Sequence, residues 1–124
     1  MSAKGSILLV DDESIVCERL QAALEKAGFE VEAYTESQQA VDRLEQRVFD
    51  VVVTDVKMRG PDGLDILHLV QHRSPSTKVV IITGFATVDT AKEAMKSGAV
   101  DFIAKPFKIS QLRDLVLKLV QAPK

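Results

Sequence analysis

Cysteine is nearly absent from this sequence, since Cys17 is the single cysteine among 124 residues. One thiol excludes a disulfide within the chain and fits a reducing compartment, so we expect a cytoplasmic protein. Long apolar runs are absent too. No stretch approaches the roughly 20 apolar residues that a membrane span needs, and the run at residues 7–10 is too short for the core of a signal peptide. We therefore expect no membrane partner.

A surplus of positive charge is also lacking, because 16 lysines and arginines face 18 aspartates and glutamates. Without a basic patch to hold a phosphate backbone, direct nucleic acid binding is not expected. What the chain does have is a globular composition, with 46% hydrophobic and 27% charged residues. The length fits one domain. We assign residues 1–121 to this domain and residues 122–124 to a tail or the start of a linker.

The stretch from residue 49 to residue 63 organises the rest of the chain. Three successive valines, residues 51–53, are typical of a strand covered on both faces, as in a parallel sheet. The cluster Gly-Pro-Asp-Gly at residues 60–63 then indicates a loop. Asp55 therefore stands where a buried strand ends. In open α/β sheets, ligands bind just outside the carboxyl ends of the strands.

Strand-like and helix-like segments alternate along the whole chain. Strands are predicted around residues 7–10, 30–34, 51–55, 78–82 and 99–103; helices are predicted around residues 14–27, 35–47, 64–73, 87–97 and 110–121. Thr35 and Gln38 have the spacing of a capping box for the second helix. Right-handed crossovers convert this alternation into a parallel sheet with helices on both sides. We predict a single flavodoxin-like, doubly wound (βα)5 domain with strand order 2-1-3-4-5.

Five polar residues stand at the predicted carboxyl ends of the strands: Asp11, Asp12, Asp55, Thr83 and Lys105. Parallel strands present these ends at one rim of the sheet, so the three carboxylates should lie together. Two unit charges about 4 Å apart repel by roughly 4 kcal/mol at an effective dielectric constant of 20. Such a cluster must take up protons or a cation. Oxygen ligands with room for water and phosphate favour Mg²⁺.

A carboxylate beside Mg²⁺ can attack phosphorus and form an aspartyl phosphate. Phosphoryl transfer depends mainly on neutralising charge and aligning the groups. The Lys105 ammonium and the Thr83 hydroxyl can each hold one phosphoryl oxygen. Gly84 has no side chain to block the approach. The sequence thus supplies an acceptor, a metal site and oxygen-binding groups, without an evident substrate pocket.

The set Asp11-Asp12, Asp55, Thr83 and Lys105-Pro106 resembles the receiver domain of two-component response regulators, over essentially the whole chain. The stretches Ile-Ile-Thr-Gly-Phe at residues 81–85 and Gly-Ala-Val-Asp-Phe-Ile-Ala-Lys-Pro-Phe at residues 98–107 are similar to receivers of the nitrogen-regulation type. In those proteins the receiver usually precedes an ATPase and a DNA-binding module. No such effector domain is present in this chain.

This resemblance implies that Asp55 accepts a phosphoryl group from a histidine kinase or a phosphotransfer protein. It also implies a set of Mg²⁺ ligands: Asp12, Asp55 and the backbone carbonyl of Lys57 bind directly, and Asp11 acts mostly through water. The domain would then act as a phosphoacceptor switch. Any chemistry of its own would be limited to Mg²⁺-dependent self-phosphorylation and self-dephosphorylation, so it is not expected to be an enzyme.

The resemblance further implies how phosphorylation is sensed. Lys105 pairs with the phosphate, and its peptide bond to Pro106 is cis. Thr83 and Phe102 form a switch pair, in which the hydroxyl moves to the phosphate and the aromatic ring turns inward. One departure is visible in the loop after Asp55, where Arg59 stands at the family's usual proline position.

The predicted fourth helix, fifth strand and fifth helix form the face that phosphorylation would switch. Phosphorylation adds about −1.5 to −2 charges and three strong acceptors, which bias a two-state element. Asp101 and Arg113 can form an ion pair on this face, and Leu117 stands off the apolar stripe of the last helix. We expect the face to bind an effector or a second copy in a homodimer; an ordinary solvated helix is the alternative.

Other functions fit parts of the pattern. A haloacid-dehalogenase-like phosphatase also uses a strand-end aspartate with Mg²⁺. Members of that class, however, have the motif Asp-x-Asp at the first strand and carry a cap domain for which this chain has no room. A nucleotide or flavin binder would need a phosphate-binding loop after the first strand, where two aspartates stand instead. A receiver-shaped module that is never phosphorylated is the third alternative, and the intact acidic site argues against it.

Overall fold

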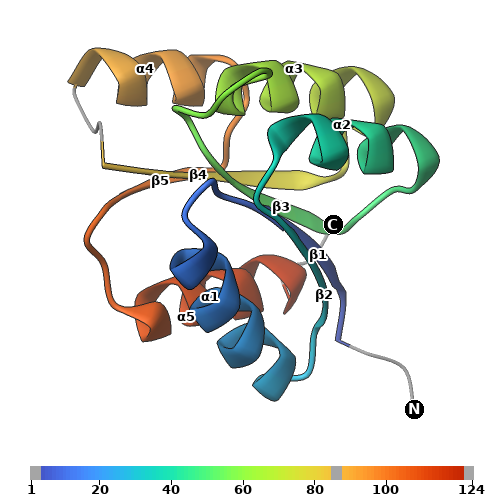
Figure 1. Cartoon of the computed structure of the whole chain (residues 1–124), viewed down its shortest axis with the longest axis vertical. Helices are drawn as coiled ribbons and strands as arrows, with labels where there is room; N and C mark the ends of the chain where they lie inside the picture. Colours follow the sequence, from blue (N-terminus) through green and yellow to red (C-terminus); the bar gives the residue numbers. More distant parts are fainter. Residues whose placement is uncertain (1–3, 85–87, 122–124) are drawn as a thin grey trace.

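The chain folds as five strands alternating with five helices in a computed structural model (Figure 1). The structure describes residues 4–84 and 88–121; the proposed tail at 122–124, and Phe85 in the stretch at residues 81–85, lie outside these. The elements in chain order are β1 (Ser6–Val10), α1 (Ser14–Lys26), β2 (Glu30–Tyr34), α2 (Ser37–Gln46), β3 (Val51–Asp55), α3 (Gly63–Arg73), β4 (Lys78–Thr83), α4 (Val88–Lys96), β5 (Asp101–Ala104) and α5 (Ile109–Gln121).

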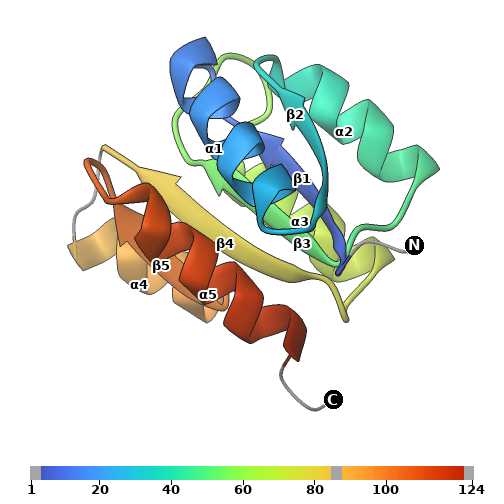
Figure 2. The same ribbon diagram turned by 90° about the horizontal axis from the view of Figure 1, so that it is seen from below.

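All strand pairs in the sheet are parallel, and the strand order is β2-β1-β3-β4-β5. Helices α2, α3 and α4 cover one face of the sheet, and α1 and α5 cover the other (Figures 1 and 2). The predicted doubly wound fold and its strand order are therefore confirmed. The chain reverses its direction of winding between β1 and β3, which places the carboxyl ends of these neighbouring strands at the topological switch point.

The strands separate two apolar cores. Alternate side chains of a strand point to opposite faces, so Ile7 and Leu9 pack in the core under α1 and α5, while Leu8 and Val10 pack in the core under α2, α3 and α4. Every residue of β3 is buried. The run of valines in β3 thus has the double cover that its composition predicts. Within the described residues, no helix has both the length and the hydropathy to cross a membrane.

Helix beginnings differ from the prediction at α2. The capping box of Thr35 and Gln38 is wrong: the chain stays extended through Glu36, which occupies the N-cap position without a side-chain hydrogen bond. A capping box occurs instead at α3, where Asp62 Oδ1 accepts from the Asp65 backbone N–H and Asp65 Oδ2 accepts from the Asp62 backbone N–H. This reciprocal cap fixes the start of α3 just after the loop that follows Asp55.

Strand β5 begins at Asp101 rather than at residue 99. The backbone N–H of Ala99 still donates to the carbonyl of Ala94 in α4, and this bond closes the turn after that helix. Pairing with β4 is then in register from Val80 opposite Asp101 to Thr83 opposite Ala104. The last residue of β4 and the residue before Lys105 therefore lie side by side at the rim.

Strand β2 lies at the edge of the sheet, and its polar side chains are paired. Glu32 accepts hydrogen bonds from Arg43, Arg47 and Tyr34, and Arg47 also bridges to Glu30. The bonds from Arg43 lower the pKa of Glu32 to about 2, against a smaller rise from burial. This charged cover makes the open edge a poor template for pairing with another strand.

Candidate functional site

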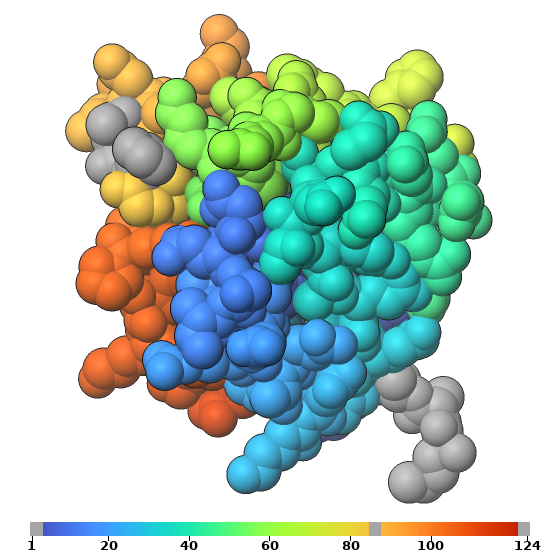
Figure 3. All heavy atoms as spheres, in the orientation of Figure 1, coloured from blue at the N-terminus to red at the C-terminus, as the bar shows by residue number. Residues whose placement is uncertain are grey.

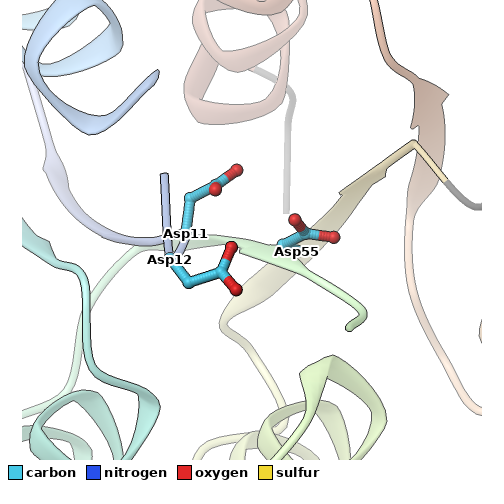
Figure 4. A group of neighbouring side chains, drawn as sticks. All are labelled: Asp11, Asp12 and Asp55. Atoms are coloured by element: carbon cyan, nitrogen blue, oxygen red, sulfur yellow. The ribbon is translucent and has the colours of Figure 1, made fainter. Parts of the chain in front are cut away.

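An acidic cluster forms where β1 and β3 end. Asp11 and Asp12 directly follow β1, and Asp55 is the last residue of the neighbouring strand β3. One carboxylate oxygen from each residue lies within 4.8 Å of the other two, and Figure 4 shows Asp11 and Asp12 side by side with Asp55 across from them. Asp11 and Asp55 are buried, whereas Asp12 is exposed. The predicted convergence of these three residues is therefore observed.

Lys105 reaches into this cluster from the loop after β5. Its Nζ atom lies 2.6 Å from Asp11 Oδ2, 2.9 Å from Glu13 Oε1 and 3.0 Å from Asp55 Oδ2. Burial alone would lower the pKa of Lys105. Close polar contacts with Asp11, Glu13 and Asp55, together with the charge of Asp11, raise the pKa by more than burial lowers it, so the net shift is upward. The lysine stays protonated, and one ammonium faces several carboxylates.

That single ammonium does not satisfy the cluster. Asp11 is fully buried, and burial raises the pKa of Asp11 despite the opposing effect of Lys105. Asp11 Oδ2 forms an ion pair with Lys105, yet no donor among the described residues is aligned to give it a hydrogen bond. Asp11 Oδ1, by contrast, accepts from the Glu13 backbone N–H at 2.9 Å. An unsatisfied buried oxygen within an all-oxygen donor set fits a hard divalent cation.

Hydrogen bonds fix both the Asp55 carboxylate and the backbone of the next residue, Val56. Asp55 Oδ1 accepts a hydrogen bond from the Val56 N–H at 2.7 Å, and the Gly63 N–H donates to the Val56 carbonyl at 2.9 Å. A Cβ atom on Gly63 would collide with the Asp55 carbonyl oxygen. The glycine is therefore required by the close approach of α3 to the end of β3, a reason that the sequence alone did not reveal.

The loop between β3 and α3 is tied to α2. The buried Ser37 hydroxyl donates to the carbonyl of Arg59 at 2.5 Å, and the next residue, Gly60, has φ of +73°. Pro61 follows this left-handed turn. The departure from the family's usual loop sequence is thus accommodated by a glycine turn anchored on α2, and the side chains of Lys57 and Arg59 stay exposed.

The remaining predicted site residues lie at the ends of β4 and β5. Thr83 is fully buried at the end of β4. Gly84 is exposed, and a Cβ atom there would meet no atom within 4 Å among the described residues beyond its chain neighbours. Phe102 is partly buried against the core under α2, α3 and α4. The peptide bond between Lys105 and Pro106 is cis, as the resemblance implies.

The predicted interactions on the α4–β5–α5 face differ from those observed. Arg113 pairs with its neighbour Asp114 at 3.1 Å, and Asp101 Oδ1 accepts from the Phe102 backbone N–H. Among the described residues, no ion pair joins Asp101 to Arg113, because each has a nearer partner. Leu117 is half-buried and packs against the core under α1 and α5, so it does not stand free of the apolar stripe.

A cavity of about 490 Å³ lies beside the acidic cluster, between α1 and the beginning of α5. Glu13 and Lys105 line this cavity together with the apolar side chains of Val16, Leu20, Phe107 and Ile109. Figure 3 shows the start of α1 next to the chain that leads into α5 on this surface. The contact of Glu13 with Lys105 was missed from sequence, although a third acidic residue directly after Asp11 and Asp12 was the available signal.

Comparisons with known proteins agree with this geometry. The model of the response regulator receiver domain family matches residues 7–117. The alginate biosynthesis transcriptional regulatory protein AlgB of Pseudomonas aeruginosa is 40% identical over 110 residues, covering 89% of this chain and 24% of AlgB. This chain therefore spans about a quarter of the length of that relative.

Solved structures give the same result. A response regulator receiver domain protein from Clostridium thermocellum is 32% identical, with a TM-score of 0.85 and 93% coverage of each chain. NtrX from Brucella abortus is 30% identical, with a TM-score of 0.86, over 98% of this chain and 27% of that one. These relatives agree with the resemblance to nitrogen-regulation-type regulators. The chain belongs to the family of response regulator receiver domains.

Proposed function

We propose that Asp55 is the phosphoacceptor of this receiver domain and takes its phosphoryl group from the phosphohistidine of a histidine kinase or phosphotransfer protein. The observation that carries the proposal is the contact of Lys105 Nζ with Asp55 Oδ2 at 3.0 Å, inside a cluster that also contains Asp11 and Asp12. The Lys105 ammonium thus already lies beside the carboxylate that would gain the negative charge of the phosphoryl group.

The chemistry follows from this arrangement. A carboxylate oxygen of Asp55 attacks phosphorus, the P–N bond to the donor imidazole breaks, and its electron pair returns to the ring nitrogen. Lys105 neutralises one phosphoryl oxygen, and the Thr83 hydroxyl binds another. Gly84 leaves the approach open, which agrees with the empty space around its Cα. Val56 orients the carboxylate through its N–H.

We assign Mg²⁺ to the acidic cluster, with Asp12, Asp55 and the Lys57 carbonyl as direct ligands and Asp11 as a water-mediated one. When bound, the ion supplies charge neutralisation on the phosphoryl oxygens. Support comes from the all-oxygen donor set and from the buried Asp11 oxygen that lacks an aligned donor. Exposed Asp12 gives the ion a route from solvent.

The output of the switch is proposed to lie on the α4–β5–α5 face. Thr83 and Phe102 respond to the phosphate, and the face then binds an effector or a second copy of the domain. Val88 is 70% exposed and Met95 is 46% exposed on α4, which gives this face apolar contact area apart from Leu117. Sedimentation of a longer protein that includes the effector, with and without phosphorylation, should show a change of assembly; an unchanged assembly would refute this step.

The surface around the neighbouring cavity is proposed to receive the phosphodonor protein. Ile15, at the start of α1, is 51% exposed, and the cavity beside Lys105 has apolar walls. We further propose that residues 1–121 form the whole receiver domain, that residues 122–124 begin a linker, and that the domain acts in the cytoplasm as a switch rather than as an enzyme. The much greater length of AlgB supports an effector beyond this chain.

Intact-mass analysis after incubation with acetyl phosphate and Mg²⁺ tests the central proposal. We expect one added phosphate on the wild type, none on Asp55→Asn, and one on the control Asp114→Asn, which changes an exposed aspartate on α5. EDTA should abolish the reaction. Phosphate on Asp55→Asn, or continuous release of phosphate from a generic phosphomonoester over many turnovers, would refute the assignment and favour the phosphatase alternative.

A further inference from the structure

Glu13 occupies the N-cap position of α1 but does not cap the helix. Its backbone is extended, with φ of −90° and ψ of 107°, and its side chain accepts no hydrogen bond from the first turn. N-cap positions normally favour short side chains such as Ser, Thr, Asp and Asn, whose oxygen reaches the backbone N–H groups. The longer carboxylate of Glu13 extends instead to Lys105, at 2.9 Å.

Lys105 therefore has three carboxylate partners of different freedom. Asp11 is fully buried, and Asp55 is held by the Val56 N–H. The Glu13 side chain is 57% exposed, while the Lys105 side chain is 14% exposed. Glu13 is thus the partner that can leave without disturbing the core, and it lines the same cavity as Lys105.

A phosphoryl group on Asp55 would compete with Glu13 for the same ammonium. Lys105 has three N–H donors. Its Nζ atom lies within 3.0 Å of three carboxylates and donates aligned hydrogen bonds to Glu13 and Asp55. A phosphoryl oxygen on Asp55 adds a fourth acceptor around an ammonium with three donors, so one of the three carboxylate contacts is released. The release of Glu13 costs least, because its carboxylate can turn into solvent.

We propose that Glu13 is a positioning residue that holds Lys105 in the unphosphorylated state and must release it before Lys105 can bind the phosphoryl group. This inference rests on the proposed role of Asp55. Glu13 slows phosphorylation, whatever the donor, and weakens the binding of anions that occupy the phosphoryl position. The contact restrains Lys105 directly, rather than through the general negative charge at the site.

Three variants of the full chain separate these effects. Glu13→Gln removes the charge and keeps the shape. Glu13→Asp keeps the charge, but it shortens the side chain by one methylene and is a favourable N-cap, so its carboxylate turns to the helix and away from Lys105. Glu18→Gln is the matched control, since Glu18 is exposed on the same helix, outside the residues that line the cavity.

The measurements are the rate of phosphorylation by acetyl phosphate and by phosphoramidate, and the affinity for beryllofluoride with Mg²⁺. We expect Glu13→Gln to raise the rate with both donors, and the beryllofluoride affinity, by about three- to tenfold, as for one removed charge pair at this range in a solvent-screened site. Glu13→Asp should show at least half of this gain on a logarithmic scale, and Glu18→Gln should match the wild type.

Each other result overturns the inference. If Glu13→Gln equals the wild type or is slower, Glu13 does not restrain Lys105. If Glu13→Asp equals the wild type while Glu13→Gln is faster, the charge at the mouth of the site matters and the contact does not. If no variant, the wild type included, is phosphorylated on Asp55, the proposed function itself fails, a result that intact mass distinguishes from equal rates.

Discussion

Replacing Gly63 by alanine should destabilise the fold and at the same time displace Asp55, the proposed phosphoacceptor. Gly63 begins α3, and its Cα lies directly against the carbonyl of Asp55. An added Cβ atom would overlap the Asp55 carbonyl oxygen and lie 2.9 Å from the Cα atom of Val56. Both are backbone atoms at the end of a fully buried strand, so they cannot rotate away as a flexible side chain can.

The expected magnitude follows from two opposing effects. Overpacking a well-packed site costs about 1–3 kcal/mol of folding stability. Replacing glycine by alanine in a permitted backbone conformation, by contrast, stabilises the folded state by about 0.4–1 kcal/mol, because it reduces the conformational entropy of the unfolded chain. The net loss should be about 1–2 kcal/mol, which lowers Tm by about 4–8 °C for a domain of this size. Phosphorylation should slow by about ten- to a hundredfold, because the strain relaxes through Asp55.

Thermal unfolding and the rate of phosphorylation by acetyl phosphate check both parts. Gly84→Ala is the matched control for stability, since a Cβ atom at Gly84 meets no atom within 4 Å in the part of the chain that the structure describes. Its stability should stay within about 0.5 kcal/mol of the wild type. If Gly63→Ala unfolds at the same temperature as Gly84→Ala and keeps the wild-type rate, then α3 does not press on the end of β3, and the reasoning is refuted.

Three further predictions concern groups outside the acidic cluster. Hydrogen bonds from Arg43 lower the pKa of Glu32 to about 2. The ionised Glu32 therefore stabilises the folded state at pH values above its ordinary pKa of 4.5, and this contribution is lost as the pH falls towards 2. The contribution to the free energy of unfolding is about 3 kcal/mol unscreened and about 1 kcal/mol after solvent screening. Urea unfolding should therefore show a smaller loss between pH 5 and pH 2.5 in Glu32→Gln than in the wild type. Burial raises the pKa of the Cys17 thiol to about 11, so a thiol-specific reagent at pH 8 should react at least about a hundredfold faster after unfolding than before it; equal rates would contradict the buried position. Ser37→Ala should cost about 1 kcal/mol in urea unfolding through the lost bond to the Arg59 carbonyl, and an unchanged stability would show that this bond does not anchor the loop.

Hydrophobic pattern predicted the elements better than it predicted their ends. The buried strands are recognisable because residues such as Val52 and Ile81 stand in unbroken apolar runs that only a doubly covered sheet can bury. Helix starts depend instead on which side chain reaches which N–H. Thr35 and Asp62 both have capping-box spacing, and only the backbone conformation, extended through Glu36, decides between them.

The candidate site was predictable as far as it depends on topology. Asp11, Asp55 and Lys105 converge because parallel strands end at one rim. Contacts between side chains on separate elements were not predictable in the same way. The sequence does not show that Arg113 has a nearer carboxylate on its own helix than Asp101, nor that the third acid after β1 turns back to Lys105.

The charge distribution at the acidic cluster supports the proposed switch. Four carboxylates gather at the site, and one ammonium pairs with three of them: Asp11, Glu13 and Asp55. The most buried of them, Asp11, has a raised pKa because burial outweighs that ammonium. A divalent cation held by Asp12 and Asp55 would relieve part of this repulsion. In the proposed function, a phosphoryl group on Asp55 brings further negative charge and new acceptors, so the contacts of Lys105 would be redistributed among its partners. Since Lys105 follows directly after β5 and stands beside the end of β4, that redistribution acts at the strand ends that lead to α4 and α5.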